Sequence, residues 1–110
     1  MITDTRTIAT LIAAAAGLWI PAGQAADDAE TLANAARCTM CHDAQAQRLG
    51  PSWAAIAERY GSEEGALETL AARTRAGGSG EWGKAPMPAV SEEQLSDEEL
   101  EVVLRWVLER

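Results

Sequence analysis

Apolar side chains recur every three or four residues in the C-terminal half of the chain, which is the spacing of one face of an α-helix. The clearest case follows Ser96 and Glu99, whose types and spacing predict a capping box at the start of a last helix. The apolar stripe of that helix consists of Leu100, Val103, Leu104 and Val107. Another helix is predicted with Pro51 in its first turn and Gly61 at its end. Its apolar face consists of Trp53, Ile56, Ala57 and Tyr60.

Two further helices have weaker apolar patterns but recognisable ends. Asp27 and Glu30 form a capping pair that predicts a helix running to about Arg37. Ser62 can cap a third helix that ends at Gly77. The residues of this helix that are expected to face inward are Leu67, Leu70 and Ala71. No segment has the pattern of a strand, so the sequence predicts a small all-α fold.

The N-terminal segment has the order of a secretory signal peptide. A short polar start precedes an apolar run at residues 8–20, and the small residues Gly23 and Ala25 suit a cleavage site. The alternative is an uncleaved anchor, but the run is shorter than the roughly 20 apolar residues that a membrane span needs. We expect residues 1–25 to be a cleaved signal peptide and residues 26–110 to form one exported domain without stable membrane insertion.

Composition limits the classes of possible partner and the volume of side chains available to fill the core. The chain has 110 residues, with 17 acidic and 9 basic side chains and a net charge of −8. This charge disfavours nucleic acid, because an acidic protein repels the phosphate backbone. Apolar residues make up 47% of the chain, which excludes a disordered protein, but many of them are alanine. Alanine adds little core volume, so we expect something other than side chains to fill part of the centre.

Both cysteines lie in one short motif that ends in the single histidine of the chain. Cys38, Cys41 and His42 have the Cys-x-x-Cys-His spacing of c-type haem attachment. Two thiols three residues apart can each form a thioether to one haem vinyl group, and the next residue can then bind the iron. A redox disulfide and half of a zinc site are the alternatives. Zinc needs four ligands and a thioredoxin-like motif needs a βαβ context, so haem is the favoured interpretation.

A methionine is the natural second axial ligand because no other histidine remains. Met1 leaves with the signal peptide, and Met40 lies inside the attachment motif and cannot reach the far face of a haem. Met87 is left, in a Gly/Pro-rich loop over residues 77–90, between two prolines that restrict the backbone and stiffen the loop. Elimination therefore predicts that His42 and Met87 bind the iron.

Residues 26–110 resemble the small class I monohaem cytochromes c of the short bacterial periplasmic group. The resemblance rests on Cys38–His42, Leu49-Gly50-Pro51, Leu70–Arg73, Gly77–Gly83, Pro86-Met87-Pro88 and Leu104–Leu108. It implies four to five short helices wrapped around one haem c that is covalently attached through Cys38 and Cys41. It also implies that the Pro51 carbonyl accepts a hydrogen bond from the His42 ring, and that Arg73 and Trp82 bind a haem propionate.

The chain also departs from this family at a few positions. Ala89 and Val90 replace the Pro-Asn that often follows the methionine, and about three extra residues precede Ser96. Ala33 replaces the usual aromatic residue of the first helix, so thinner packing on the last helix near Trp106 is expected.

The resemblance and the ligand set together predict a soluble periplasmic one-electron carrier rather than an enzyme, because iron with two protein ligands has no open site. The expected donor is a quinol-oxidising complex, the expected acceptor is a terminal oxidase or a periplasmic reductase, and the carrier is expected to be a monomer. One alternative is a haem sensor or weak peroxidase with a labile methionine, in which Lys84 could replace Met87 at high pH. Another is a haem subunit of a larger periplasmic complex.

A run of acidic residues near the last helix allows two interpretations. It consists of Glu92, Glu93, Asp97, Glu98, Glu99 and Glu101. A negative rim could steer a basic partner, and the alternative is a solvated face whose acids favour the helix N-terminus.

Overall fold

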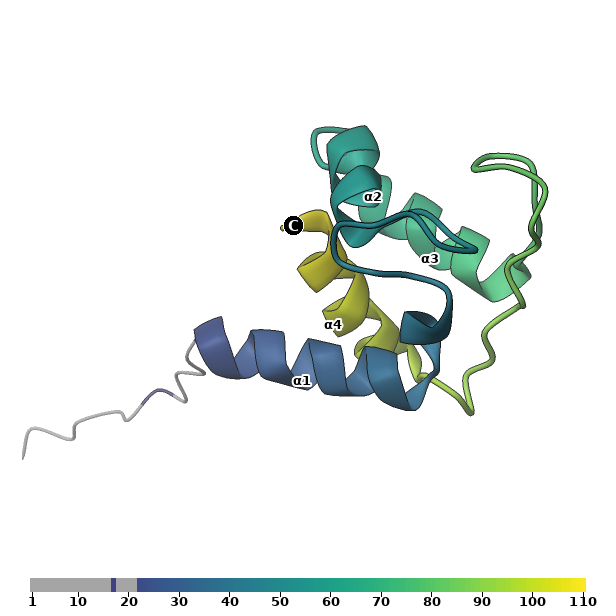
Figure 1. Cartoon of the computed structure of the whole chain (residues 1–110). Coiled ribbons are helices and arrows are strands. Elements are labelled where there is room, and N and C mark those ends of the chain that lie inside the picture. Colours follow the sequence, from purple (N-terminus) through teal and green to yellow (C-terminus); the bar gives the residue numbers. More distant parts are fainter. Residues whose placement is uncertain (1–16, 18–21) are drawn as a thin grey trace, which may run out of the picture.

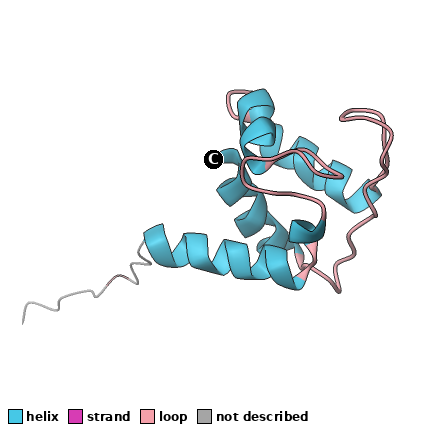
Figure 2. Ribbon diagram, in the orientation of Figure 1, coloured by secondary structure: helices cyan, strands magenta, loops and turns pink. Residues whose placement is uncertain are grey.

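The computed structural model describes Gly17 and residues 22–110, and within these residues the elements are helices joined by loops (Figure 2). The elements are α1 (Ala22–Ala35), the 3₁₀-helix η1 (Cys38–Met40), α2 (Trp53–Tyr60), α3 (Ala66–Ala76) and α4 (Asp97–Leu108). The only strand-like pairing in the described part is an isolated bridge between Gly78 and Met87. The all-α prediction is therefore confirmed. Most of the predicted signal peptide lies outside the described residues.

Helices α2 and α4 begin close to the predicted positions because local side chains cap them, and α2 also ends just before Gly61, as predicted. The Ser96 hydroxyl accepts from the Glu99 backbone N–H at 3.2 Å, and the Glu99 carboxylate accepts from the Ser96 N–H at 3.0 Å. These two bonds complete the capping box. The bond from the Ser96 backbone N–H is the main cause that holds the pKa of the Glu99 carboxyl below its usual value. At α2 the cap is Ser52, whose hydroxyl accepts from Ala55, so Pro51 precedes the helix instead of lying in its first turn.

A Ser96→Ala variant should unfold at lower denaturant concentration, because it leaves the Glu99 backbone N–H in the first turn of α4 without its side-chain acceptor. We expect a loss of about 1 kcal/mol in the free energy of unfolding, which chemical denaturation followed by circular dichroism can measure. Ser62→Ala is the matched control, since Ser62 is exposed and caps no helix. An equal loss in both variants would contradict the capping argument.

The predicted starts of the other two helices are wrong. Helix α1 is already formed at Ala22, so Asp27 lies in its interior and caps nothing. Alanines on both sides of Asp27 favour the helix and extend it towards the N-terminus. Helix α3 begins at Ala66, after Gly65, which adopts a left-handed conformation with φ of 76°. That conformation interrupts the helix that Ser62 was expected to open, so Glu63 precedes α3 in a turn.

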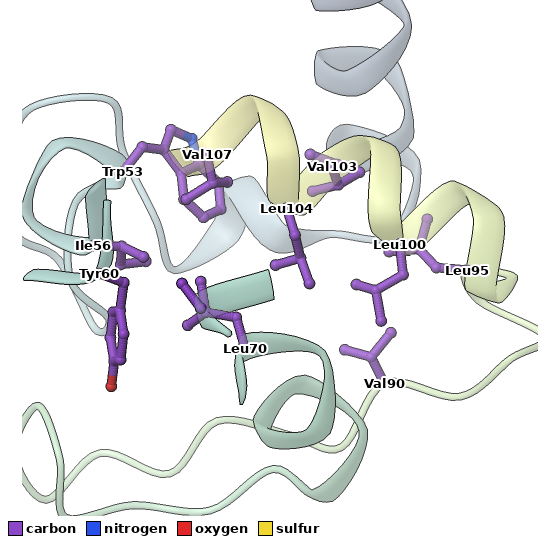
Figure 3. Close-up of a cluster of buried hydrophobic side chains, with 12 residues drawn as sticks. Trp53, Ile56, Tyr60, Leu70, Val90, Leu95, Leu100, Val103, Leu104 and Val107 are labelled. Atoms are coloured by element: carbon purple, nitrogen blue, oxygen red, sulfur yellow. The ribbon is translucent and has the colours of Figure 1, made fainter. Parts of the chain in front are cut away.

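Helix α4 is the central element, since α1, α2 and α3 all pack against it (Figure 1). Its predicted apolar stripe is buried and faces side chains from α2 and α3 (Figure 3). In α1, Ala29 and Ala33 are fully buried, and the α1–α4 contact is the most extensive between helices. Small side chains at these two positions let the helices approach closely, and whether an aromatic residue at Ala33 would pack more densely near Trp106 stays a prediction.

No helix within the described residues is long and apolar enough to cross a membrane.

Candidate functional site

The Cys-x-x-Cys-His motif follows α1 in a tight turn. Backbone N–H groups of Cys41 and His42 both donate to the Cys38 carbonyl, at 3.2 and 3.0 Å. The two cysteines form no disulfide with each other. Burial is the main cause that raises the pKa of the Cys38 thiol. The turn thus holds both sulfur atoms and the imidazole close together along the chain.

The loop after His42 returns the chain so that residues 50–53 surround the imidazole ring. The Gly50 N–H donates to the Cys41 carbonyl and the Trp53 N–H donates to the Asp43 carbonyl, both at 2.9 Å. The Asp43 carboxylate accepts from the backbone N–H groups of Ala46 and Gln45, which lowers the pKa of Asp43. These bonds fix the loop on both sides of His42.

The His42 ring is buried and has a fixed orientation. Its Nδ1–H donates to the Pro51 carbonyl at 2.6 Å, and the ring stacks on Trp53 with centroids 4.7 Å apart and planes inclined by 17°. A proton on Nδ1 leaves the lone pair on Nε2 as a metal ligand. The Nδ1–H bond to a carbonyl is also the kind of contact that orients a ligating histidine and increases its basicity. The contact between Pro51 and His42 that the resemblance implied is present.

A largely apolar cavity of about 320 Å³ adjoins these residues, which is within the usual size range of small-molecule and cofactor sites. Its wall includes Cys38, Cys41, His42 and Met87. The apolar stripe of α4 and side chains of α2 and α3 complete the wall. The structure therefore brings the predicted attachment residues and both predicted axial ligands to one cavity.

The Met87 loop is anchored near the end of α3. Gly78 and Met87 exchange two backbone hydrogen bonds of 2.9 Å each, and the Val90 N–H donates to the Thr74 carbonyl at 3.0 Å. Gly78 has a φ of 121°, a conformation that favours glycine. In Figure 1 this green loop stands away from the helices, yet these bonds hold Met87 at the cavity.

Arg73 and Trp82 also line the cavity, but their present partners are protein groups. The Arg73 guanidinium forms an ion pair with Glu81 at 2.6 Å, and the Trp82 ring lies 5.1 Å from the Arg59 guanidinium carbon. The sequence prediction missed Glu81. Its only signal is that it is the single acidic residue of the loop over residues 77–90, directly before Trp82.

The residues present fit a covalently bound haem better than the alternatives. Two thiols, an imidazole and a thioether share one apolar cavity, and this donor set matches c-type attachment with His and Met ligands. Gly50 leaves room for the His42 ring beside the chain, because a Cβ at this position would lie 2.6 Å from the His42 Cε1 atom. Zinc is disfavoured, since no group of three His, Cys, Asp or Glu side chains in the described residues could hold a metal ion.

Comparison with known proteins gives the same family. The Cytochrome c family model matches residues 26–110. Cytochrome c-552 of Hydrogenobacter thermophilus is 37% identical over 79 residues, which cover 72% of this chain and 78% of that protein. Cytochrome c2 of Rubrivivax gelatinosus is 40% identical over 77 residues, covering 70% and 91% of the two chains.

A solved structure extends the likeness to three dimensions. Wild-type cytochrome c552 of Nitrosomonas europaea superposes with a TM-score of 0.67 at 31% identity, covering 73% of this chain and 96% of that one. The family, its covalently attached haem c and the helical fold follow from these matches. The chain therefore belongs to the cytochrome c family and is a small monohaem class I cytochrome c, a haem-containing electron carrier.

Proposed function

We propose that residues 26–110 form a periplasmic one-electron carrier whose haem is attached through Cys38 and Cys41, with His42 and Met87 as axial ligands. The observation that carries the proposal is the shared cavity, because all four side chains line it. The hydrogen bond from His42 Nδ1 to Pro51 supports it further, since it leaves Nε2 as the ligating atom.

The chain's own residues each have a defined part in this proposal. Pro51 and Trp53 hold the imidazole in one orientation. The bridge to Gly78 restrains the Met87 backbone, so its thioether would be held in place as a ligand of the haem iron. The apolar residues of α4 exclude water from the cavity. The bound haem supplies the one-electron chemistry, and two permanent protein ligands leave no open position for a substrate, which favours a carrier over an enzyme.

Arg73 and Trp82 are suited to bind a haem propionate. A guanidinium is a charge-assisted donor to a carboxylate, and the indole N–H is a neutral donor. Both residues line the cavity. Arg73 already holds a carboxylate, that of Glu81, which supports its capacity to hold another.

Export is part of the proposal. The predicted signal peptide, residues 1–25, would direct the chain to the periplasm, and cleavage after Ala25 would leave most of α1 in the mature protein. We infer a monomer that takes electrons from a quinol-oxidising complex and delivers them to a terminal oxidase or a periplasmic reductase. Such encounters use small, transient interfaces.

The acidic run near α4 is better explained by local structure than by docking. Three of its six members have partners within the fold: Asp97 with Arg75, Glu99 in the capping box, and Glu101 with Arg105. The remaining three are exposed. Acids in the first turn of α4 also interact favourably with the helix dipole.

Absorption spectra of the exported protein, oxidised and reduced, test the proposed function. We expect a c-type reduced spectrum and, in the oxidised protein, the weak near-infrared band of a Met-sulfur-to-ferric-iron bond. A c-type spectrum without that band would refute Met87 as the ligand and favour a sensor or peroxidase with an open iron. Absence of a covalently bound haem would refute the attachment through Cys38 and Cys41.

A further inference from the structure

The carboxylate of Glu81, at the cavity wall, contacts three hydrogen-bond donors that come from two helices. Glu81 accepts from the Tyr60 hydroxyl at 2.6 Å, and it forms ion pairs with Arg73 at 2.6 Å and with Arg59 at 3.3 Å. Arg59 and Tyr60 come from α2, Arg73 comes from α3, and Glu81 comes from the loop that also carries Met87. We call Arg59, Tyr60, Arg73 and Glu81 the rim cluster. Three of its four members, all but Arg59, line the cavity.

The rim cluster lies at the border between the core and solvent. The Tyr60 side chain is 4% exposed, and Figure 3 shows its hydroxyl pointing away from the aliphatic side chains of the core. The Glu81 side chain is 33% exposed, and the side chains of Arg59 and Arg73 are about half exposed. The hydrogen bond from Tyr60, followed by the charges of Arg59 and Arg73, lowers the pKa of Glu81. Glu81 is therefore ionised at neutral pH.

We propose that Glu81 is a positioning residue that also tunes the electron affinity of the site: it holds Arg73 and Tyr60 at the cavity and favours the oxidised state. The inference rests on the proposed function, because it needs a haem in this cavity. It concerns a residue whose side chain is neither a thioether link nor an axial ligand.

The reason is a charge balance. The rim cluster carries two guanidinium charges and one carboxylate charge, so its net charge is +1, and neutralising Glu81 would make it +2. The oxidised site carries one more positive charge than the reduced site, so extra positive charge at the cavity disfavours oxidation. A cavity with apolar walls transmits this effect better than bulk water does. The same ion pairs are too exposed to contribute much to the free energy of unfolding.

A Glu81→Gln variant of the haem-loaded protein separates the charge from the hydrogen bond, because the amide oxygen still accepts from Tyr60. We expect the equilibrium constant for reduction to rise about threefold to tenfold, where tenfold corresponds to about 59 mV for one electron. Glu58→Gln is the matched control, since Glu58 is an exposed residue of the same helix as Tyr60 and lies outside the cavity wall. The control should change the constant by less than about twofold, because exposed charges are well screened. Equal potentials in wild type and Glu81→Gln would overturn the proposal.

The pH dependence of the potential gives a second, independent readout. As pH falls through the lowered pKa of Glu81, its carboxylate is protonated, and the wild-type potential should rise to the level of Glu81→Gln. The variant should lack this step. In Tyr60→Phe the step should move to higher pH, because the largest cause that lowers the pKa of Glu81 is gone.

The outcomes also distinguish this proposal from the proposed function. A step that persists in Glu81→Gln would come from a haem propionate and would overturn the assignment to Glu81. A step that stays at the same pH in Tyr60→Phe would overturn it as well. A wild-type protein without a c-type spectrum would instead refute the proposed function, before any variant is compared.

Discussion

In a Met87→Ala variant, we expect added imidazole or cyanide to bind at the iron, and the equilibrium constant for reduction to fall more than about a hundredfold. The fall corresponds to about 120 mV at 59 mV per tenfold change. Two effects contribute to it. The methionine thioether raises the potential of a c-type haem, and its removal opens a coordination position to water and to external ligands. Spectroelectrochemistry and ligand titration of the purified protein measure both.

Met40→Ala is the control for this experiment, since Met40 is 65% exposed and lies outside the cavity wall. It should retain the wild-type potential and should bind no added imidazole. If Met87→Ala kept the near-infrared sulfur band and the wild-type potential, Met87 would not be the ligand. If Met40→Ala alone lost them, the elimination that excluded Met40 would be wrong.

A Gly50→Ala variant should disturb the site through the imidazole. The new Cβ would lie 2.6 Å from His42 Cε1 and 3.0 Å from Nδ1, so the ring has to move. The ring cannot move without disturbing its stacking on Trp53 or its 2.6 Å hydrogen bond to Pro51. We expect a loss of about 1–3 kcal/mol in the free energy of unfolding, as for other overpacked sites, together with an altered haem spectrum. Denaturant unfolding and absorption spectroscopy are the measurements.

Gly65→Ala separates displacement of His42 from the general cost of replacing glycine. Gly65 has a φ of 76°, and no atom beyond its immediate chain neighbours lies within 4 Å of the Cβ that alanine would add, so its variant has backbone strain but no clash with the rest of the fold. It should lose stability by about 1–2 kcal/mol and keep the wild-type spectrum. An unchanged spectrum and full stability in Gly50→Ala would contradict the close approach seen here.

Local signals predicted much of the fold. The start of α4 follows from a cap and an apolar stripe that lie within a few residues of each other, and both are where the sequence indicates. The start of α3 was mispredicted because two local signals compete. Ser62 can cap a helix, but the left-handed turn at Gly65 interrupts it, and only the three-dimensional path of the chain shows which signal prevails.

Some features of the candidate site can likewise be predicted from the sequence, and others cannot. The order of Cys38, Cys41 and His42 is visible in the sequence, and elimination led to Met87. The approach of Pro51 to His42 spans nine residues and followed only from the family resemblance. Glu81 meets Tyr60 across 21 residues, a contact that no periodicity, cap or motif of this chain encodes, so it needed the folded structure.

The nearness of three tryptophans to the cavity has an optical consequence. Trp53 and Trp82 line the cavity, and Trp106 lies edge-on to Trp53 with ring centroids 5.7 Å apart. A haem in that cavity absorbs where indole emits and lies within a few nanometres of all three rings, so resonance energy transfer quenches their fluorescence. The fourth tryptophan, Trp19, belongs to the predicted signal peptide. In the mature protein, recovery of tryptophan emission would therefore report the separation of the polypeptide from its own chromophore as the chain unfolds.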